Sequence, residues 1–374
     1  MNRRKGRMIM KKRMVKQVST AAMAGMMMTA TLNMTAFADE IPKNVTLTKN
    51  ITKEGNIYAP NTTFVFAVRP GTAVPAGQGQ EAIYAGPAGG VTLDNNGIIA
   101  STPATGDIGK TVITAGTTTL KVNESVFTQG ENAKPGIYRY IVSETAADAE
   151  GNAYEGVTYT RDEKYFDVYV TYNSSDQLEV SSYTFVKAGN TKEKDDGVFT
   201  NDYSSTHNTL HDLTVKKEVT GNQGDRSKDF EFTLKVDGAE GEKYYVTFSD
   251  QRAPITLVSG TAQTITLKAD QTAKIWGLSD SDKYTVTEDD YSEDGYTTTI
   301  DRQQTATTTG TITTGAGTTA NNGDKNITVV NDKNTTTPGG IFLHVTPYIA
   351  LLGAAIASGL LFFRRRHVKE ADID

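Results

Sequence analysis

The residues best placed to do chemistry in this sequence are polar residues at the ends of strand-like apolar segments. Side chains at alternate positions share one face of a β-strand. By that rule three segments in each half of the chain carry a lysine, a glutamate or an asparagine on their apolar face. These residues are Lys49, Glu144 and Asn201 in the first half, and Lys217, Glu288 and Asn331 in the second half.

A buried set of this kind can form a Lys–Asn isopeptide bond. Desolvation lowers the pKa of a lysine and raises that of a glutamate, so the amine becomes a neutral nucleophile and the acid keeps its proton. The acid could then polarise the asparagine carbonyl and carry protons while ammonia leaves. The alternative is that these residues only end their strands, with the lysine snorkelling and the glutamate in a rim salt bridge. Recurrence in the same order in both halves favours the cross-link.

The elements that must position these residues are short β-strands. From residue 39 to 340, alternating runs rich in Thr, Val, Tyr and Phe are separated by Gly, Asn and Asp. This pattern predicts an all-β protein with two tandem immunoglobulin-like β-sandwiches built from antiparallel strands. A polar joint at 202–212 separates the predicted domains, 39–205 and 206–335. Two further segments, 70–90 and 305–323, are predicted to be exposed loops.

The two halves resemble each other, which predicts an internal duplication. Four segments recur in the same order. The pairs are 45–49 with 213–217, 63–66 with 229–232, 140–144 with 284–288, and 198–201 with 328–331.

Composition excludes several classes of function. The 374 residues include no cysteine and only four histidines, so disulfides, thiol chemistry and a Cys- or His-rich metal centre are not expected. The net charge is −6, but residues 39–363 hold 26 basic and 41 acidic residues, a net charge of −15. Such a surface disfavours nucleic acid as a partner. No cofactor is expected.

Both ends of the chain are predicted to be targeting segments. Eight basic residues, an apolar stretch and Ala36-Phe37-Ala38 predict a signal peptide over 1–38, removed before Asp39. An uncharged run over 341–363 is followed by three arginines, which predicts a transmembrane helix with a cytoplasmic basic tail.

The sequence resembles the two-domain major, or backbone, pilins of Gram-positive bacteria, which are built from streptococcal-type pilin isopeptide linkage domains. The likeness covers nearly all of 41–366, and its most specific segments are 213–217, 224–230 and 284–291. The resemblance implies one Lys–Asn bond in each domain, assisted by Glu144 in the first and by Glu288 in the second. It also implies that the two sandwiches are Cna-B-like and that the protein is a cell-surface pilus subunit.

The resemblance further implies assembly by a class C-type pilus sortase, with a cell-wall sorting signal over 336–374. The expected motif is Thr336-Thr337-Pro338-Gly339-Gly340, in which Gly340 stands where the family has Thr. A membrane anchor that is never cleaved is the alternative. The acceptor lysine lies a short way before the first asparagine, which indicates Lys194, with Lys187 and Lys192 as alternatives.

These features are compatible with three classes of function. The leading hypothesis is a shaft subunit joined to other copies of itself, to tip or minor pilins and to possible host surface ligands. The second is a wall- or membrane-anchored adhesin or stalk that is not polymerised. An enzyme is the third, but the sequence contains no Ser-His-Asp set, metal cluster or phosphate loop. We therefore expect only single-turnover self-cross-linking.

Overall fold

The computed structural model describes residues 44–77, 81–131, 133–189, 193–207, 209–300, 312–313, 318–319, 323–335 and 358. The predicted signal peptide lies outside this part of the chain, and so does the sorting segment apart from Ser358. Within the described residues no helix is both long and apolar enough to cross a membrane.

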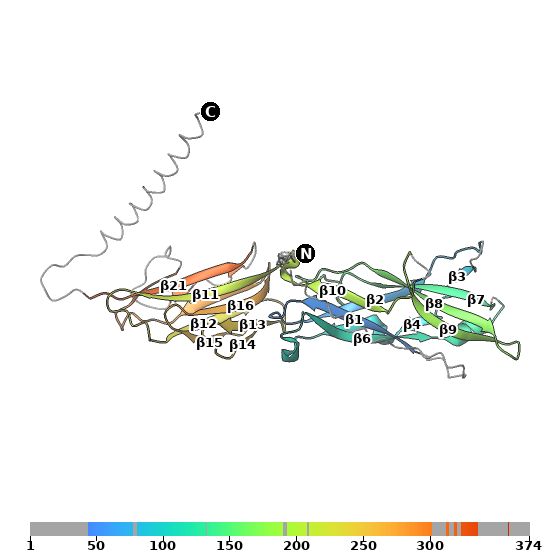
Figure 1. Ribbon diagram of the computed structural model, residues 1–374, viewed down its shortest axis with the longest axis horizontal. Coiled ribbons are helices and arrows are strands. Elements are labelled where there is room, and N and C mark those ends of the chain that lie inside the picture. The colour runs from blue at the N-terminus through green and yellow to red at the C-terminus, as the bar shows by residue number, and fades with distance from the viewer. Residues whose placement is uncertain are drawn as a thin grey trace, which may run out of the picture. The chain divides into compact units, whose positions relative to one another are not determined.

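The described chain is built almost entirely from β-strands, which confirms the predicted β-sandwich class (Figure 1). Val, Thr, Tyr and Phe dominate these strands because branched and aromatic side chains pack well on a pleated surface. The helical elements are short. They are α1 (Glu124–Thr128), η1 (Asp94–Gly97), η2 (Thr105–Asp107) and η3 (Ser205–His207).

Two sheets form the first sandwich. One has the order β10-β1-β6-β4, and the other has the order β5-β2-β7-β8-β9, with β3 paired to β7. Their strands are β1 (Asn44–Lys53), β2 (Thr62–Pro70), β3 (Ile83–Ala85), β4 (Val91–Leu93), β5 (Ile98–Ser101), β6 (Val112–Val122), β7 (Gly136–Glu144), β8 (Glu163–Tyr172), β9 (Leu178–Lys187) and β10 (Val198–Tyr203).

Two further sheets form the second sandwich. Their orders are β14-β13-β16-β11-β21-β18 and β15-β12-β17-β19, with β20 paired to β17. The strands are β11 (Leu210–Thr220), β12 (Phe230–Asp237), β13 (Lys243–Phe248), β14 (Ile255–Val258), β15 (Gln263–Leu267), β16 (Thr272–Ser279), β17 (Lys283–Glu288), β18 (Thr297–Ile300), β19 (Ile312–Thr313), β20 (Thr318–Thr319) and β21 (Lys325–Asp332). The domain limits 39–205 and 206–335 stay a prediction.

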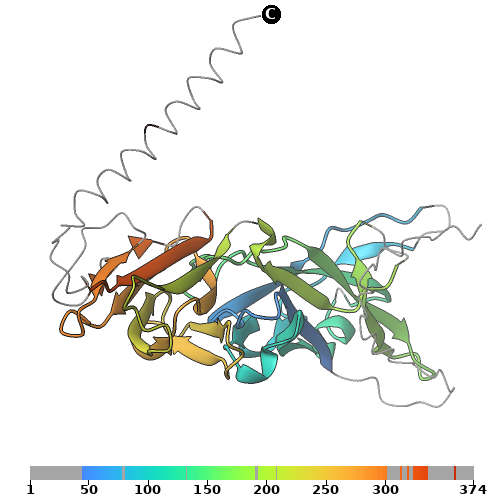
Figure 2. The same ribbon diagram turned by 60° about the vertical axis from the view of Figure 1, so that its left-hand side comes forward.

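The two sandwiches share one arrangement around the candidate residues. In each, the first and last strands are parallel neighbours, β1 with β10 and β11 with β21, as Figures 1 and 2 show. The glutamate lies on a strand of the facing sheet, where Glu144 is opposite Phe66 and Glu288 is opposite Phe232. These pairings are equivalent in the repeat, so the duplicated segments have the same places in both sandwiches.

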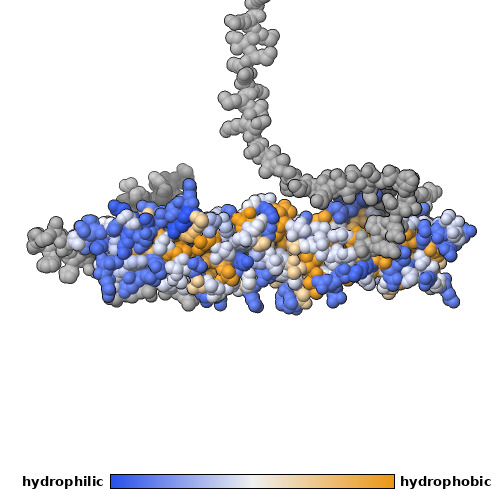
Figure 3. All heavy atoms as spheres, turned by 90° about the horizontal axis from the view of Figure 1, so that it is seen from below, coloured by the Kyte–Doolittle hydropathy of each residue, from blue (hydrophilic) through white to orange (hydrophobic). Residues whose placement is uncertain are grey.

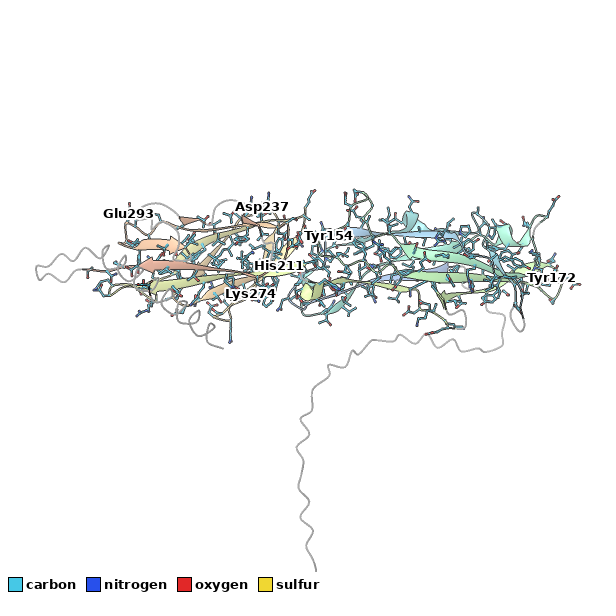
Figure 4. All side chains as sticks on the ribbon, turned by 90° about the horizontal axis from the view of Figure 1, so that it is seen from above. Tyr154, Tyr172, His211, Asp237, Lys274 and Glu293 are labelled. Atoms are coloured by element: carbon cyan, nitrogen blue, oxygen red, sulfur yellow. The ribbon has the colours of Figure 1, made fainter. Side chains whose placement is uncertain are left out.

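Each sandwich has its own apolar core, filled by the inward faces that the alternation predicts. Leu47, Phe64 and Val142 are fully buried in the first, and Leu213 and Phe232 in the second. On the face seen in Figure 3, hydrophilic residues are interspersed with apolar patches. Among the described residues the most exposed large apolar side chain is Tyr172, at the tip of the β8–β9 hairpin and labelled in Figure 4.

The segment 70–90 is not simply an exposed loop, because it contains β3 and covers part of β7. The backbone N–H groups of Gly71 and Gly86 both donate to the Arg139 carbonyl, at 2.8 Å. A side chain at Gly71 would collide with Arg139 Cγ at 2.6 Å, so only glycine permits this approach. Beneath it Arg139 forms a bidentate, buried ion pair with Asp167 on β8. The sequence did not predict this cover, because Arg139 and Asp167 are charged residues on a face that alternation places outward.

Candidate cross-linking sites

The first candidate site joins β1, β7 and β10 through one carboxylate. Lys49 Nζ donates to Glu144 Oε2 at 2.7 Å, and Asn201 Nδ2 donates to Glu144 Oε1 at 2.7 Å. Lys49 is 0%, Asn201 1% and Glu144 8% exposed. The three residues proposed from strand alternation are therefore brought together inside the sandwich.

Aromatic rings surround this polar set. The Lys49 amine lies 4.6 Å from the centroid of the Phe64 ring, and Phe66 packs edge-on against Phe199 with centroids 5.1 Å apart. Such walls exclude water, so the amine and the carboxylate have only each other and Asn201 to replace their hydration. Phe64 and Phe230 occupy equivalent positions in the internal repeat, but the sequence did not identify either ring as part of a site.

The second candidate site repeats this arrangement with looser contacts. Lys217 Nζ lies 2.8 Å from Glu288 Oε1, as an ion pair outside hydrogen-bond geometry, and Asn331 Nδ2 donates to the same oxygen at 3.3 Å. All three residues are at most 1% exposed. Phe230 takes the place of Phe64, with its ring centroid 4.3 Å from the Lys217 amine.

Burial shifts the pKa values of these groups in the direction that the chemistry requires. Desolvation lowers the pKa of Lys49 and that of Lys217 to about 8, although the neighbouring carboxylates oppose the shift. It raises the pKa of Glu144, and it raises that of Glu288 to about 6, against the attraction of the lysines. Both shifts favour the neutral forms, an amine and a carboxylic acid.

Burial alone does not define a cross-linking lysine. Lys53 also points inward from β1 and is 4% exposed, and burial lowers its pKa. Its amine donates to the carbonyl oxygens of Glu54, Ile57 and Lys110, at 3.1, 2.7 and 2.9 Å. Three fixed acceptors satisfy the ammonium, so Lys53 is a structural residue. Lys49 and Lys217 differ from Lys53 because each contacts a glutamate carboxylate that an asparagine also contacts.

Of the candidate acceptor lysines, Lys194 and Lys187 lie within the described residues and Lys192 does not. Lys187 is half exposed and paired with Glu193 at 3.0 Å. Lys194 is exposed, its backbone forms an isolated bridge with Val186, and within the described residues its side chain has no ion pair. The sorting motif 336–340 lies outside the described part of the chain.

Within the described residues no group of three or more His, Asp or Glu side chains is arranged to hold a metal ion. Two buried acidic residues are nevertheless close together in the second sandwich. The Tyr244 hydroxyl contacts Glu242 Oε2 at 2.8 Å and Asp282 Oδ2 at 3.0 Å. Tyr203 donates to the other oxygen of Glu242. No signal in the sequence pointed to this cluster.

Family models match both halves of the chain. Residues 45–204 match a model described as a Spy0128-like isopeptide containing domain, and residues 211–333 match a domain of unknown function, DUF7601. The comparison with solved structures finds the major pilin from Streptococcus pyogenes, with a TM-score of 0.53 and 28% identity, over 78% of this chain and 99% of that one. The T3.2 major pilin of the same species, at 23% identity and a TM-score of 0.52, shares the fold.

A curated relative settles the family. A pilin of Streptococcus pyogenes serotype M1 is 31% identical over 342 residues, which cover 86% of this chain and 91% of that protein. Together with two sandwiches that each bury a Lys–Glu–Asn set, this likeness shows that the chain belongs to the Gram-positive pilin family.

Proposed function

We propose that this protein is the shaft subunit of a covalently polymerised pilus on the surface of a Gram-positive cell. The observation that carries the proposal is the pair of buried Lys–Glu–Asn sets, each with its lysine and asparagine on the first and last strands of a sandwich and its glutamate on the facing sheet. Family membership supports it, because the pilin relatives match 86% and 78% of the chain. The chain would act on no external substrate, and its only reaction would be the single closure of its own cross-links.

In each sandwich the cross-link would join two parallel neighbouring strands. Lys49 lies beside Phe199 in the β1–β10 register, and Lys217 lies beside Val329 in the β11–β21 register. An isopeptide bond to Asn201 or Asn331, two residues further along, spans that short separation. It replaces a buried ammonium by a neutral amide and so removes the cost of burying the charge.

We propose Lys194 as the amine that joins one subunit to the next. Lys194 is exposed and has no ion pair among the described residues, which favours it over Lys187, whose amine is paired with Glu193. A class C-type pilus sortase would cut within the motif 336–340 and hold the subunit as a thioester. The Lys194 amine of another copy would then resolve that thioester. The exported subunit would be held briefly by the 341–363 segment. Tip or minor pilins and host surface ligands are further proposed partners.

Intact mass tests the internal cross-links. Recombinant 39–337 should fall short of its sequence mass by two ammonia molecules, one for each bond. Glu288→Ala should restore one ammonia, because it removes the acid that serves the second site. A full sequence mass in the unmodified protein would refute both bonds.

Denaturing gels of cell-wall extracts test polymerisation. Cells that carry the unmodified protein should give a ladder of high-mass species, because covalent fibres survive detergent and heat. Lys194→Ala should abolish the ladder, and Lys187→Ala, the matched control on a neighbouring exposed lysine, should keep it. A single band from the unmodified protein would favour an anchored adhesin or stalk instead.

A further inference from the structure

The side-chain amide of Asn201 is held in one orientation. Its Oδ1 accepts a hydrogen bond from the Thr160 backbone N–H at 3.0 Å, while its Nδ2 donates to Glu144 Oε1 at 2.7 Å. A backbone N–H can only donate, so the atom facing Thr160 must be the oxygen. The carbonyl therefore points away from the glutamate, which differs from the expectation that the acid polarises it.

This orientation separates two tasks that the reaction requires. Attack on Asn201 Cγ places negative charge on Oδ1, where the Thr160 N–H already points. The leaving nitrogen faces the carboxyl group of Glu144, whose other oxygen contacts the attacking Lys49 amine at 2.7 Å. We propose that the Thr160 backbone N–H is the oxyanion donor of the first cross-linking site, and that Glu144 serves only to transfer protons. The inference rests on the proposed Lys49–Asn201 bond.

The step balances without any other reactant. Proton transfer from Lys49 to Glu144 gives a neutral amine and a carboxylic acid. The nitrogen lone pair attacks Cγ, and the carbonyl electrons move to Oδ1 against the Thr160 N–H. Glu144 gives its proton to Asn201 Nδ2 and receives one from Lys49 Nζ, which is now bonded to Cγ. The Cγ–Nδ2 bond breaks, the carbonyl re-forms, and one ammonia leaves for each amide formed.

Hydrogen bonds on both sides of Asn201 hold the donor in place. The Thr160 hydroxyl lies 2.9 Å from the Thr200 carbonyl and 3.3 Å from Asn201 Oδ1, and its single proton favours the shorter contact. Thr158 and Asp202 exchange two backbone hydrogen bonds, at 2.8 and 3.2 Å. The segment 158–160 is thus fixed to β10 around Asn201, so the N–H is aimed before the reaction begins, as electrostatic stabilisation requires.

The second site has a different environment at the equivalent oxygen. Among the described residues Asn331 Oδ1 is buried without a hydrogen-bond partner, and Glu288 contacts both Lys217 and Asn331 through the same oxygen. Changes at Thr160 should therefore slow only the Lys49–Asn201 bond. The Lys217–Asn331 bond of the same molecule is then an internal control for synthesis and handling.

The experiment measures how fast each bond forms after synthesis of the 39–337 chain. Cell-free translation is stopped, samples are quenched in acid at intervals, and tryptic mass spectrometry quantifies both linked peptides. In one variant the α-hydroxy acid analogue of threonine replaces Thr160, so an ester oxygen takes the place of the N–H and the side chain is unchanged. Thr160→Pro removes the same N–H by ordinary mutagenesis.

The ester variant should form the Lys49–Asn201 peptide at least about tenfold more slowly, since loss of one oxyanion donor costs about 10²–10³-fold in a well-formed site. Thr160→Val should slow it only about threefold, through loss of the anchor on Thr200, and Thr160→Ser should recover that rate. An unchanged rate in the ester variant would overturn the inference. Absence of the linked peptide from the unmodified chain would instead refute the proposed bond itself.

Discussion

At the scale of single residues, burial lowers the free energy needed to convert the buried Lys–Glu ion pair into a neutral amine and a neutral carboxylic acid. A lysine and a glutamate with their ordinary pKa values of 10.5 and 4.5 differ by 6 units, and proton transfer between them costs about 8 kcal/mol. At the second site burial brings the two pKa values toward each other, to about 8 for Lys217 and about 6 for Glu288, so the same transfer costs much less free energy. The apolar walls thereby lower the free-energy cost of generating a neutral, nucleophilic amine.

The same shifts predict a pH dependence in a variant that cannot cross-link. In Asn331→Ala the Lys217 amine persists, and between pH 8 and 10.5 the unfolded chain binds more protons there than the native one. Stability should therefore rise over this range, by up to about 3 kcal/mol. Between pH 4.5 and 6 the native state binds more protons at Glu288, so stability should fall by up to about 2 kcal/mol as the pH increases.

Urea unfolding at a series of pH values measures both slopes. The unmodified protein, in which Lys217 would be an amide nitrogen, should lack this lysine's contribution above pH 8. Identical profiles for the two proteins in that range would show either that the amine is free in both, so that no cross-link forms, or that burial does not lower its pKa.

At the scale of elements, the proposed bonds tie the first strand of each sandwich to its last. Each closes a chain segment of more than a hundred residues, which restricts the unfolded state and is worth about 5 kcal/mol by analogy with disulfides. Asn331→Ala should therefore lower the melting temperature of the second sandwich by roughly 10–20 °C. Calorimetry on 39–337 measures the change.

Asn326→Ala is the matched control for this measurement. Asn326 is exposed on the same strand, β21, and outside the apolar core, so its loss should leave the melting temperature nearly unchanged. Equal effects of the two substitutions would mean that Asn331 contributes no cross-link.

Strand alternation predicted those parts of the site that a local sequence pattern can reveal. It identified the inward faces of β1, β7 and β10, and the repeat strengthened this identification because the same residue types recurred in order. It could not find Thr160, which lies between strands and acts through its backbone. It also could not find the cover over Arg139, because that burial depends on where the segment 70–90 returns to the sheet. Both are tertiary contacts without a periodic signal.

At the scale of the whole molecule, the cross-links determine how the chain bears tension. Pulled from its ends, the chain would carry force from Lys49 to Asn201, along the connection to β11, and from Lys217 to Asn331. Residues between the joined pairs would bear no load. In the fibre, tension entering at Lys194 would likewise bypass 218–330. The single-molecule extension of the unmodified protein should therefore be short.

Force spectroscopy on 39–337, held at its two ends, tests this load path. Asn331→Ala should add one unfolding event that releases roughly 110 residues, or about 360–400 Å of contour length at 3.3–3.6 Å per residue. Asn201→Ala should add a separate event from the first sandwich, and Asn326→Ala should add none. Long extensions from the unmodified protein would show that force passes through the folded strands. In that case the internal bonds would not protect the shaft under load.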